Sequence, residues 1–141
     1  MSDLRPLDGY ACVVPVVVRW RDLDPLGHVN NAVIASYFEM ARLAVLQEHF
    51  PVATPQEVSF VIARLSIDFR RPIRITDEVR IGVRVGRLGS SSYTFEYRVE
   101  ASGELAALGE TVQVHLDEGR SRPAPLPAEL RQRLAGLQEP S

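Results

Sequence analysis

The distribution of hydrophobic periods along the chain limits the fold more than any other feature of the sequence. Only one long stretch, residues 32–50, carries apolar side chains at helical spacing: Ile34, Tyr37, Phe38, Ala41 and Val45. Four later stretches alternate apolar and polar residues with a period of two, which predicts strands at 61–70, 79–86, 93–100 and 105–116. An apolar, β-branched stretch at 13–20 predicts one more strand before the helix.

The short turns between the later strands favour antiparallel pairing. Each predicted strand has an apolar face, and the helix is the only long element available to cover it. We therefore expect an α+β fold in which an antiparallel sheet of about five strands wraps around one long central helix. Pro15 suggests that the first strand lies at a sheet edge, and a bulge is expected near Gly109 and Glu110. The helix should end near Phe50, because Pro51 disfavours helical geometry just before it.

The length of 141 residues is most simply that of one domain. We expect this domain to span residues 1–141, with a loose lead-in at 1–11, a connector at 53–57 and a C-terminal tail at 120–141. The tail should hold a short helix that carries Leu130, Leu134 and Leu137. The N-terminus lacks the apolar run of a secretion signal, and no stretch reaches membrane-spanning length, so the cytoplasm is the expected location.

Composition excludes several classes of function. A net charge of −2 gives no electrostatic reason to expect a nucleic acid or an acidic membrane as a partner. All 16 basic residues are arginine, so mechanisms that need a catalytic lysine are excluded. Cys12 is the only cysteine, which rules out an internal disulfide and a cysteine-rich metal site. We interpret it as a core residue of the first strand rather than a nucleophile.

The segment between the first strand and the helix, residues 22–31, concentrates the polar chemistry of the chain. It reads Asp-Leu-Asp-Pro-Leu-Gly-His-Val-Asn-Asn, and Pro25 and Gly27 impose a turn. The strand thus delivers a polar cluster to a helix start, whose unpaired N–H groups and partial positive charge suit a developing anion. This pattern indicates an active site. The alternative is helix capping by Asp22, Asn30 or Asn31, which accounts for one of these residues but not for the crowding.

Three other interpretations of the cluster fail on the sequence. A phosphatase with an aspartyl nucleophile needs a lysine and a second acidic pair, and this chain has neither. A calcium loop starting at Asp22 would place Leu26 and Val33 at ligand positions. His49 and His115 do not have metal-ligand spacing with Asp24 and His28, so no metal is expected.

The motif Asp22-Leu-Asp24-Pro-Leu-Gly27-His28-Val29-Asn30-Asn31, followed by Tyr37-Phe38-Glu39-x-Ala41-Arg42, resembles the 4-hydroxybenzoyl-CoA thioesterase branch of the hotdog-fold thioesterases. The resemblance covers nearly the whole chain, because this family has the same order of strand, long helix and four strands. It implies hydrolysis of a fatty or aromatic acyl-CoA thioester to the free acid and CoA, with no cofactor. One helix cannot cover five strands on its own, and exposed sheet edges invite pairing, so we expect a homodimer, or a homotetramer formed by its doubling, with edge strands joined into one continuous sheet.

The resemblance also implies roles for individual residues. Asp24 matches the catalytic carboxylate, as nucleophile or general base, and the backbone N–H of Asn31 matches the oxyanion donor. His28 either hydrogen-bonds Asp24 or packs the loop, and Glu39 is the alternative catalytic carboxylate, with an ion pair to Arg42 as its structural explanation. Other expected substrate contacts are Asn30, Tyr37, Arg71, Arg87, Ser90, Ser91, Arg120 and Arg122. The arginines among them suit the phosphates of coenzyme A.

Two departures from related motifs bear on the function. Relatives that act on carrier-protein thioesters have asparagine two residues after the catalytic aspartate, where this chain has Leu26. A hotdog enoyl-CoA hydratase would place its acid and imidazole five residues apart, whereas Asp22 and Asp24 lie six and four residues before His28. A non-catalytic acyl-CoA or lipid-binding module is the remaining alternative, although such a module has little use for Asp24. Val33, Ile34 and Tyr37 suggest an apolar acyl pocket.

Overall fold

The computed structural model describes residues 7–50 and 59–138 of the chain. The described strands are β1 (Cys12–Val16), β2 (Phe60–Phe69), β3 (Val79–Leu88), β4 (Ser92–Ala101) and β5 (Glu104–His115). The described α-helices are α1 (Asn31–His49) and α2 (Ala128–Ala135), and two 3-10 turns form at Leu7–Gly9 and Trp20–Asp22. The connector expected at 53–57 lies outside the described residues.

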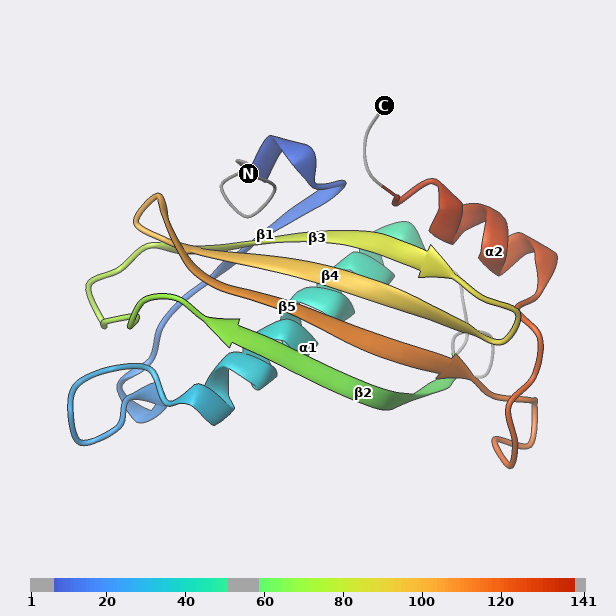
Figure 1. The fold of residues 1–141 in the computed structure, drawn as a ribbon, viewed down its shortest axis with the longest axis horizontal. Helices are drawn as coiled ribbons and strands as arrows, with labels where there is room; N and C mark the ends of the chain where they lie inside the picture. Colours follow the sequence, from blue (N-terminus) through green and yellow to red (C-terminus); the bar gives the residue numbers. More distant parts are fainter. Residues whose placement is uncertain (1–6, 51–58, 139–141) are drawn as a thin grey trace.

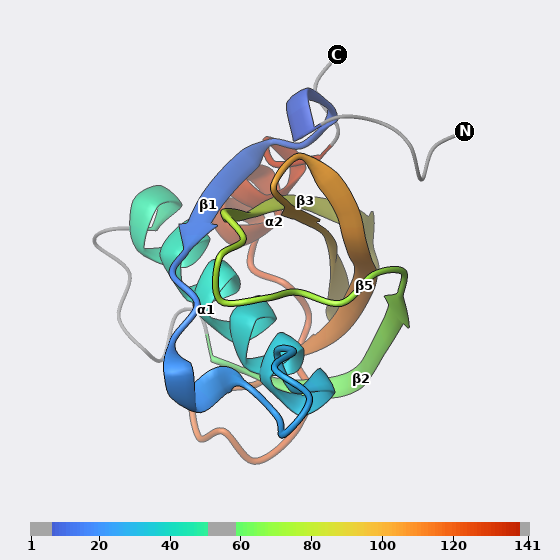
Figure 2. The same cartoon turned by 90° about the vertical axis from the view of Figure 1, so that its left-hand side faces the viewer.

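The described strands form one antiparallel sheet in the order β1-β3-β4-β5-β2. The long helix α1 runs along one face of this sheet (Figure 1), and the end-on view in Figure 2 shows the sheet curving around it. The α+β fold expected from the sequence, an antiparallel sheet of five strands around one central helix, is confirmed. The edge position of β1, expected from Pro15, is confirmed as well.

The core lies between α1 and the concave face of the sheet. On β4 the inward-facing side chains are almost completely buried: Tyr93, Phe95, Tyr97 and Val99. On α1 the buried side chains are Ile34, Tyr37, Phe38, Ala41, Arg42, Val45 and Leu46. The five apolar residues that carry the helical period in the sequence all belong to this buried set.

Gly109 on β5 marks a close approach of the helix to the sheet. A Cβ added there would overlap with the ring of Phe38, which stacks on Tyr97 with 4.3 Å between centroids and 4° between planes. The bulge expected near Gly109 is wrong, because Gly109 pairs in register with both neighbouring strands. The register shifts lie elsewhere, for instance between Ile62 and Arg64 of β2. The glycine serves packing against α1 rather than an irregularity of the strand.

The first strand is shorter than the apolar stretch 13–20 predicts. β1 ends at Val16, which pairs with Val79, the first residue of β3. Beyond Val16 the partner strand has not yet begun, so the chain loses its ladder hydrogen bonds and enters the 3-10 turn at Trp20–Asp22. The hydrophobic pattern could not reveal this limit because it is set by β3.

Residues 7–11 of the expected loose lead-in are packed against the outer face of the sheet. The side chains of Leu7 and Tyr10 are buried, and both lie over Gly82 of β3, where a Cβ would come within 3 Å of each. The Arg84 guanidinium also lies 4.5 Å from the centre of the Tyr10 ring. This segment therefore contributes to the covering of β3.

The C-terminal tail forms a short helix, α2, that carries Leu130 and Leu134 as predicted, but the helix ends at Ala135, so the expected helical position of Leu137 is wrong. Leu130, Leu134 and Leu137 are buried, and they join the core cluster at the end of the sheet where β3 finishes. Arg133 of α2 donates a 2.9 Å hydrogen bond to the backbone oxygen of His49 at the C-terminus of α1. The tail is thus attached to both the sheet and the central helix.

Candidate active site

The polar segment 22–31 folds as a tight loop that enters α1. An antiparallel bridge pairs Leu23 with Val29, and Gly27 between them adopts a φ of 81°, a conformation that favours glycine. The Val29 N–H donates to the backbone oxygen of Ile73 at 2.7 Å, which attaches the loop to the segment before β3. The loop is therefore held from both sides, and Asp24 sits on its first arm.

The carboxylate of Asp24 is oriented by the loop backbone. Its Oδ1 accepts hydrogen bonds from the N–H groups of Leu26 at 2.9 Å and His28 at 3.1 Å. Among the described residues, no hydrogen bond is made by Oδ2. One carboxylate oxygen thus fixes the orientation, and the other remains available to a reactant. The His28 ring makes no hydrogen bond to Asp24 within the described residues, so the hydrogen bonds between these two residues all involve the His28 backbone.

At the start of α1, one asparagine caps the helix and the next is the expected oxyanion donor. The side chain of Asn30 caps the helix, because its Oδ1 accepts a 2.8 Å hydrogen bond from the Ala32 N–H. Asn31 is the first helical residue, and its N–H has no intrahelical partner by geometry and no other partner among the described residues. It lines the same pocket as Asp24.

Asp22 has a different role from Asp24, although the two are separated by one residue. Its side chain is 1% exposed and accepts hydrogen bonds from the Arg19 backbone at 2.9 Å and the Tyr37 hydroxyl at 2.7 Å. An ion pair with Arg19 at 3.0 Å adds to these. Burial opposes ionisation of Asp22, but the hydrogen bonds from Arg19 and Tyr37 outweigh it and lower the pKa of the carboxyl. Asp22 therefore joins the loop to the helix.

Tyr37, expected as a substrate contact, is instead a buried partner of Asp22. Its side chain is 1% exposed and does not line the pocket that holds Asp24. Burial and the adjacent carboxylate both raise the pKa of its hydroxyl. The helical spacing that suggested an acyl contact reflects core packing and the bond to Asp22.

The pocket beside Asp24 has a volume of about 400 Å³. Asp24, His28 and Asn31 enter it from the loop and the helix start. Apolar walls complete it, from Val29, Ile34, Phe69, Pro72, Ile73, Ala106 and Ala107. A carboxylate and the first residue of a helix thus line one pocket with partly apolar walls, an arrangement that suits acyl-transfer chemistry.

Arg71 is the one expected arginine that lies at this pocket. Its guanidinium forms ion pairs with Asp77 at 3.4 Å and Glu104 at 3.2 Å, and donates to the backbone oxygen of Ala101 at 3.0 Å. Arg70 also lines the pocket and pairs with Asp68 at 2.9 Å. Both guanidinium groups are partly exposed, so an anionic group of a ligand would add to or compete with these pairs.

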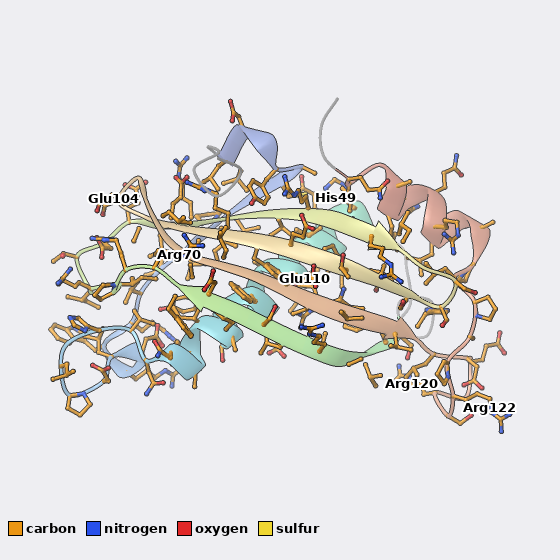
Figure 3. The ribbon with its side chains drawn as sticks, in the orientation of Figure 1. His49, Arg70, Glu104, Glu110, Arg120 and Arg122 are labelled. Carbon is orange, nitrogen blue, oxygen red and sulfur yellow. The ribbon has the colours of Figure 1, made fainter. Side chains whose placement is uncertain are left out.

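The other residues expected to contact coenzyme A lie at the opposite end of the sheet. Ser90 and Ser91 form the turn between β3 and β4, and their backbone oxygens accept hydrogen bonds from Leu126 and His115. Arg120 and Arg122 lie beyond the end of β5 (Figure 3), far from the loop at 22–31. Arg87 lines a separate hollow of about 630 Å³ with Arg64 and Arg84. A single chain therefore does not bring these residues to Asp24.

Two remaining candidates are also placed by the structure. Glu39 is exposed on α1 and does not line the Asp24 pocket, and among the described residues it forms no ion pair with Arg42. The Cys12 thiol is buried, 3.4 Å from His49 Nε2, and burial together with Glu48 raises its pKa to about 11. A thiol with this pKa stays protonated, which supports its interpretation as a core residue.

Several pocket residues are not among those predicted from the sequence. Phe69 is the last residue of β2, Pro72 and Ile73 come from the segment that links β2 to β3, and Ala106 and Ala107 come from the start of β5. They reach Asp24 only because β5 lies between β4 and β2 in the sheet. The paired alanines on an otherwise bulky strand are the one feature that could have indicated a cavity.

A family model described as the thioesterase-like superfamily matches residues 18–134, which include the loop, α1 and the whole sheet except β1. The chain belongs to this superfamily. The prediction of a hotdog-fold thioester hydrolase is therefore confirmed at the level of the family.

Individual relatives support the assignment. A thioesterase from Thermus thermophilus, whose crystal structure is a complex with coenzyme A and zinc, is 49% identical to this chain, with a TM-score of 0.82 over 92% of this chain and 96% of its own. The acyl-CoA thioester hydrolase YbgC of Escherichia coli O6:H1 is 27% identical over 80% of this chain and 87% of its own. The long-chain acyl-CoA thioesterase FadM of Escherichia coli K12 is 28% identical over 84% and 93%.

Two further observations concern metals and membranes. Within residues 7–50 and 59–138, no three His, Cys, Asp or Glu side chains come together as a ligand set for a metal ion. Within the same two ranges, no helix has the length and hydropathy needed to cross a membrane.

Proposed function

We propose that this protein hydrolyses acyl-CoA thioesters with Asp24 as its catalytic carboxylate and the Asn31 N–H as its oxyanion donor. The observation that carries the proposal is that Asp24, whose Oδ2 makes no hydrogen bond among the described residues, and Asn31, the first residue of α1, line the same pocket of about 400 Å³. The names of the relatives YbgC and FadM support CoA as the thiol carrier.

The chemistry follows from this placement. The thioester carbonyl oxygen accepts a hydrogen bond from the Asn31 N–H, and the partial positive charge of the helix start stabilises the oxyanion as it forms. The Asp24 carboxylate then either attacks the carbonyl carbon, expelling the CoA thiolate and leaving an anhydride for water to cleave, or deprotonates a water that attacks directly. Both routes give the free acid and CoA, and neither requires a metal or a cofactor.

A hydrolysis screen of the purified protein tests the activity. We expect the protein to hydrolyse acyl-CoAs, measured as free thiol released. This rate should be well above the rate at which it hydrates an enoyl-CoA. The substrates should include straight chains of graded length and aromatic acyl groups. Binding of acyl-CoA without release of thiol from any of them would contradict the proposal and favour the non-catalytic binding module.

We also propose that the active unit is a homodimer joined through β2. This strand is a free edge of the sheet, and it exposes Val61, Ile62, Leu65 and Phe69 to between 40% and 48%. Met40 and Leu43, on the side of α1 that one chain leaves uncovered, are also about half exposed. A long apolar edge of this kind calls for a partner. Antiparallel pairing of β2 with its copy would bring the far end of one chain, with Arg120 and Arg122, toward Asp24 of the other.

Light scattering tests the dimer. We expect a mass of about twice 15.7 kDa at micromolar concentration, with further doubling to a tetramer permitted. Leu65→Glu, which places a charge in the proposed β2 interface, should shift the protein to monomers and reduce activity, whereas Val17→Glu, at an 81% exposed site outside it, should not. A wild-type monomer that retains full activity would contradict this arrangement.

A further inference from the structure

The side chains packed between α1 and the sheet can be followed inward from the Asp24 pocket in regular steps. Ile34 on α1 and Ala107 on β5 line the pocket itself. One helical turn further along α1 is Phe38, and two residues further along the same face of β5 is Gly109. A helical turn advances about 5.4 Å and two strand residues about 6.7 Å, so the helix and the strand stay in step.

Phe38 and Gly109 meet at this second step and close the passage. The Phe38 ring is fully buried, stacks on Tyr97 and lies so close to Gly109 that a Cβ there would overlap with it. Tyr97 and Ile67 flank Gly109 on the two neighbouring strands. The Phe38 ring therefore fills the space between helix and sheet at this step and stands in the way of an alkyl chain.

A polar layer lies directly behind this closure. Arg42, one turn beyond Phe38, donates to the Tyr97 hydroxyl at 3.2 Å, and that hydroxyl lies 2.8 Å from Oγ1 of Thr111. Thr111 in turn bonds Gln113, whose Nε2 donates to the backbone oxygen of Tyr93 at 3.1 Å. These groups are buried and satisfy one another, so an apolar chain that reached them would break their hydrogen bonds.

We propose that Phe38 sets the depth of the acyl pocket, so that the protein takes compact acyl groups, short chains or a single ring, and excludes long straight chains. This inference rests on the proposed function. Removing the ring would deepen the pocket by about one helical turn. The pocket would then end at the polar layer formed by Arg42, Tyr97 and Thr111. The gain in chain length is therefore bounded.

The test is a chain-length profile of kcat/KM for butanoyl-, benzoyl-, octanoyl- and palmitoyl-CoA. We expect wild type to prefer the butanoyl and benzoyl substrates. Phe38→Ala should raise the octanoyl to butanoyl ratio by about tenfold or more, since each accommodated methylene changes discrimination severalfold. Palmitoyl-CoA should remain a poor substrate. Phe38→Leu should give a smaller shift in the same direction and keeps the core filled if the alanine variant does not fold.

Phe95→Leu is the matched control. Phe95 is as fully buried as Phe38 and packs against Tyr97, but it pairs with Thr111 and lies beyond the closure. It should lower stability without changing the chain-length profile. Equal shifts in Phe95→Leu and Phe38→Leu, or a wild type that hydrolyses palmitoyl-CoA as fast as butanoyl-CoA, would overturn the proposal.

Binding of free octanoate separates this inference from the proposed activity. If wild type releases thiol from no acyl-CoA, the proposed function fails, and pocket depth is still measured by ligand-induced thermal stabilisation. Octanoate should then raise the melting temperature of Phe38→Leu or Phe38→Ala more than that of wild type and of Phe95→Leu. The same increase in all of them would show that Phe38 does not limit the pocket.

Discussion

Asp24→Asn is expected to lower kcat by about a hundredfold or more while leaving the fold and acyl-CoA binding intact. The substitution removes the nucleophile or base, but an asparagine Oδ1 can still accept the N–H groups of Leu26 and His28 that hold the loop. The thermal transition and the binding constant for a non-hydrolysable acyl-CoA should therefore stay close to those of wild type. Steady-state kinetics with the best substrate of the screen measure the loss.

Glu39→Gln is the matched control for this loss. Glu39 is exposed on α1 and outside the pocket, so its amide should retain near-normal turnover. The opposite result, normal turnover in Asp24→Asn and none in Glu39→Gln, would move the catalytic role to the helix carboxylate. Normal turnover in both variants would leave the pocket without a catalytic carboxylate and contradict the mechanism.

Most of the fold could be predicted because its determinants are local. The helical period of Ile34, Phe38 and Ala41 and the alternation along β3 and β4 each report which face of an element is buried. The end of β1 and the role of Gly109 could not be predicted in this way. Val16 is the last strand residue because β3 begins opposite it, and Gly109 is required because Phe38 packs on it. Both depend on contacts between segments far apart in the sequence.

In the candidate site, too, the local features could be predicted from the sequence and those that depend on distant contacts could not. The loop at 22–31 is local, so the sequence places Asp24 and Asn31 beside one helix start, and the structure has them in one pocket. Tyr37 carries the same helical period whether it faces a ligand or the buried Asp22, and only the structure separates the two. The arginines expected at the phosphates of coenzyme A are predicted from residue type, from their positions at strand ends and, for Arg120 and Arg122, from the family resemblance. Arg71 lies at the pocket, whereas Arg120 and Arg122 lie at the opposite end of the sheet.

The buried carboxylate of Asp22 should make folding sensitive to acid. Asp22→Asn removes the charge that Arg19 and Tyr37 stabilise, and we expect it to cost about 2 kcal/mol at pH 7, the range of hydrogen bonds to a charged group. For a domain of this size that corresponds to a melting temperature lower by roughly 6 °C. Because the folded pKa of Asp22 is lowered, its contribution is complete above the unfolded value of about 3.9 and is lost as the pH falls through the folded value. The difference between wild type and Asp22→Asn should therefore shrink as the pH falls below about 4.

Denaturant unfolding at a series of pH values from neutral to acidic measures this difference. Asp8→Asn is the control, because Asp8 is exposed and forms no hydrogen bond or ion pair within the described residues, so its substitution should change stability little at any pH. A constant gap between wild type and Asp22→Asn across the series would mean that the lost stability comes from packing rather than from the charge. An Asp22→Asn variant as stable as wild type at pH 7 would contradict the role of Asp22 in joining the loop at 22–31 to α1.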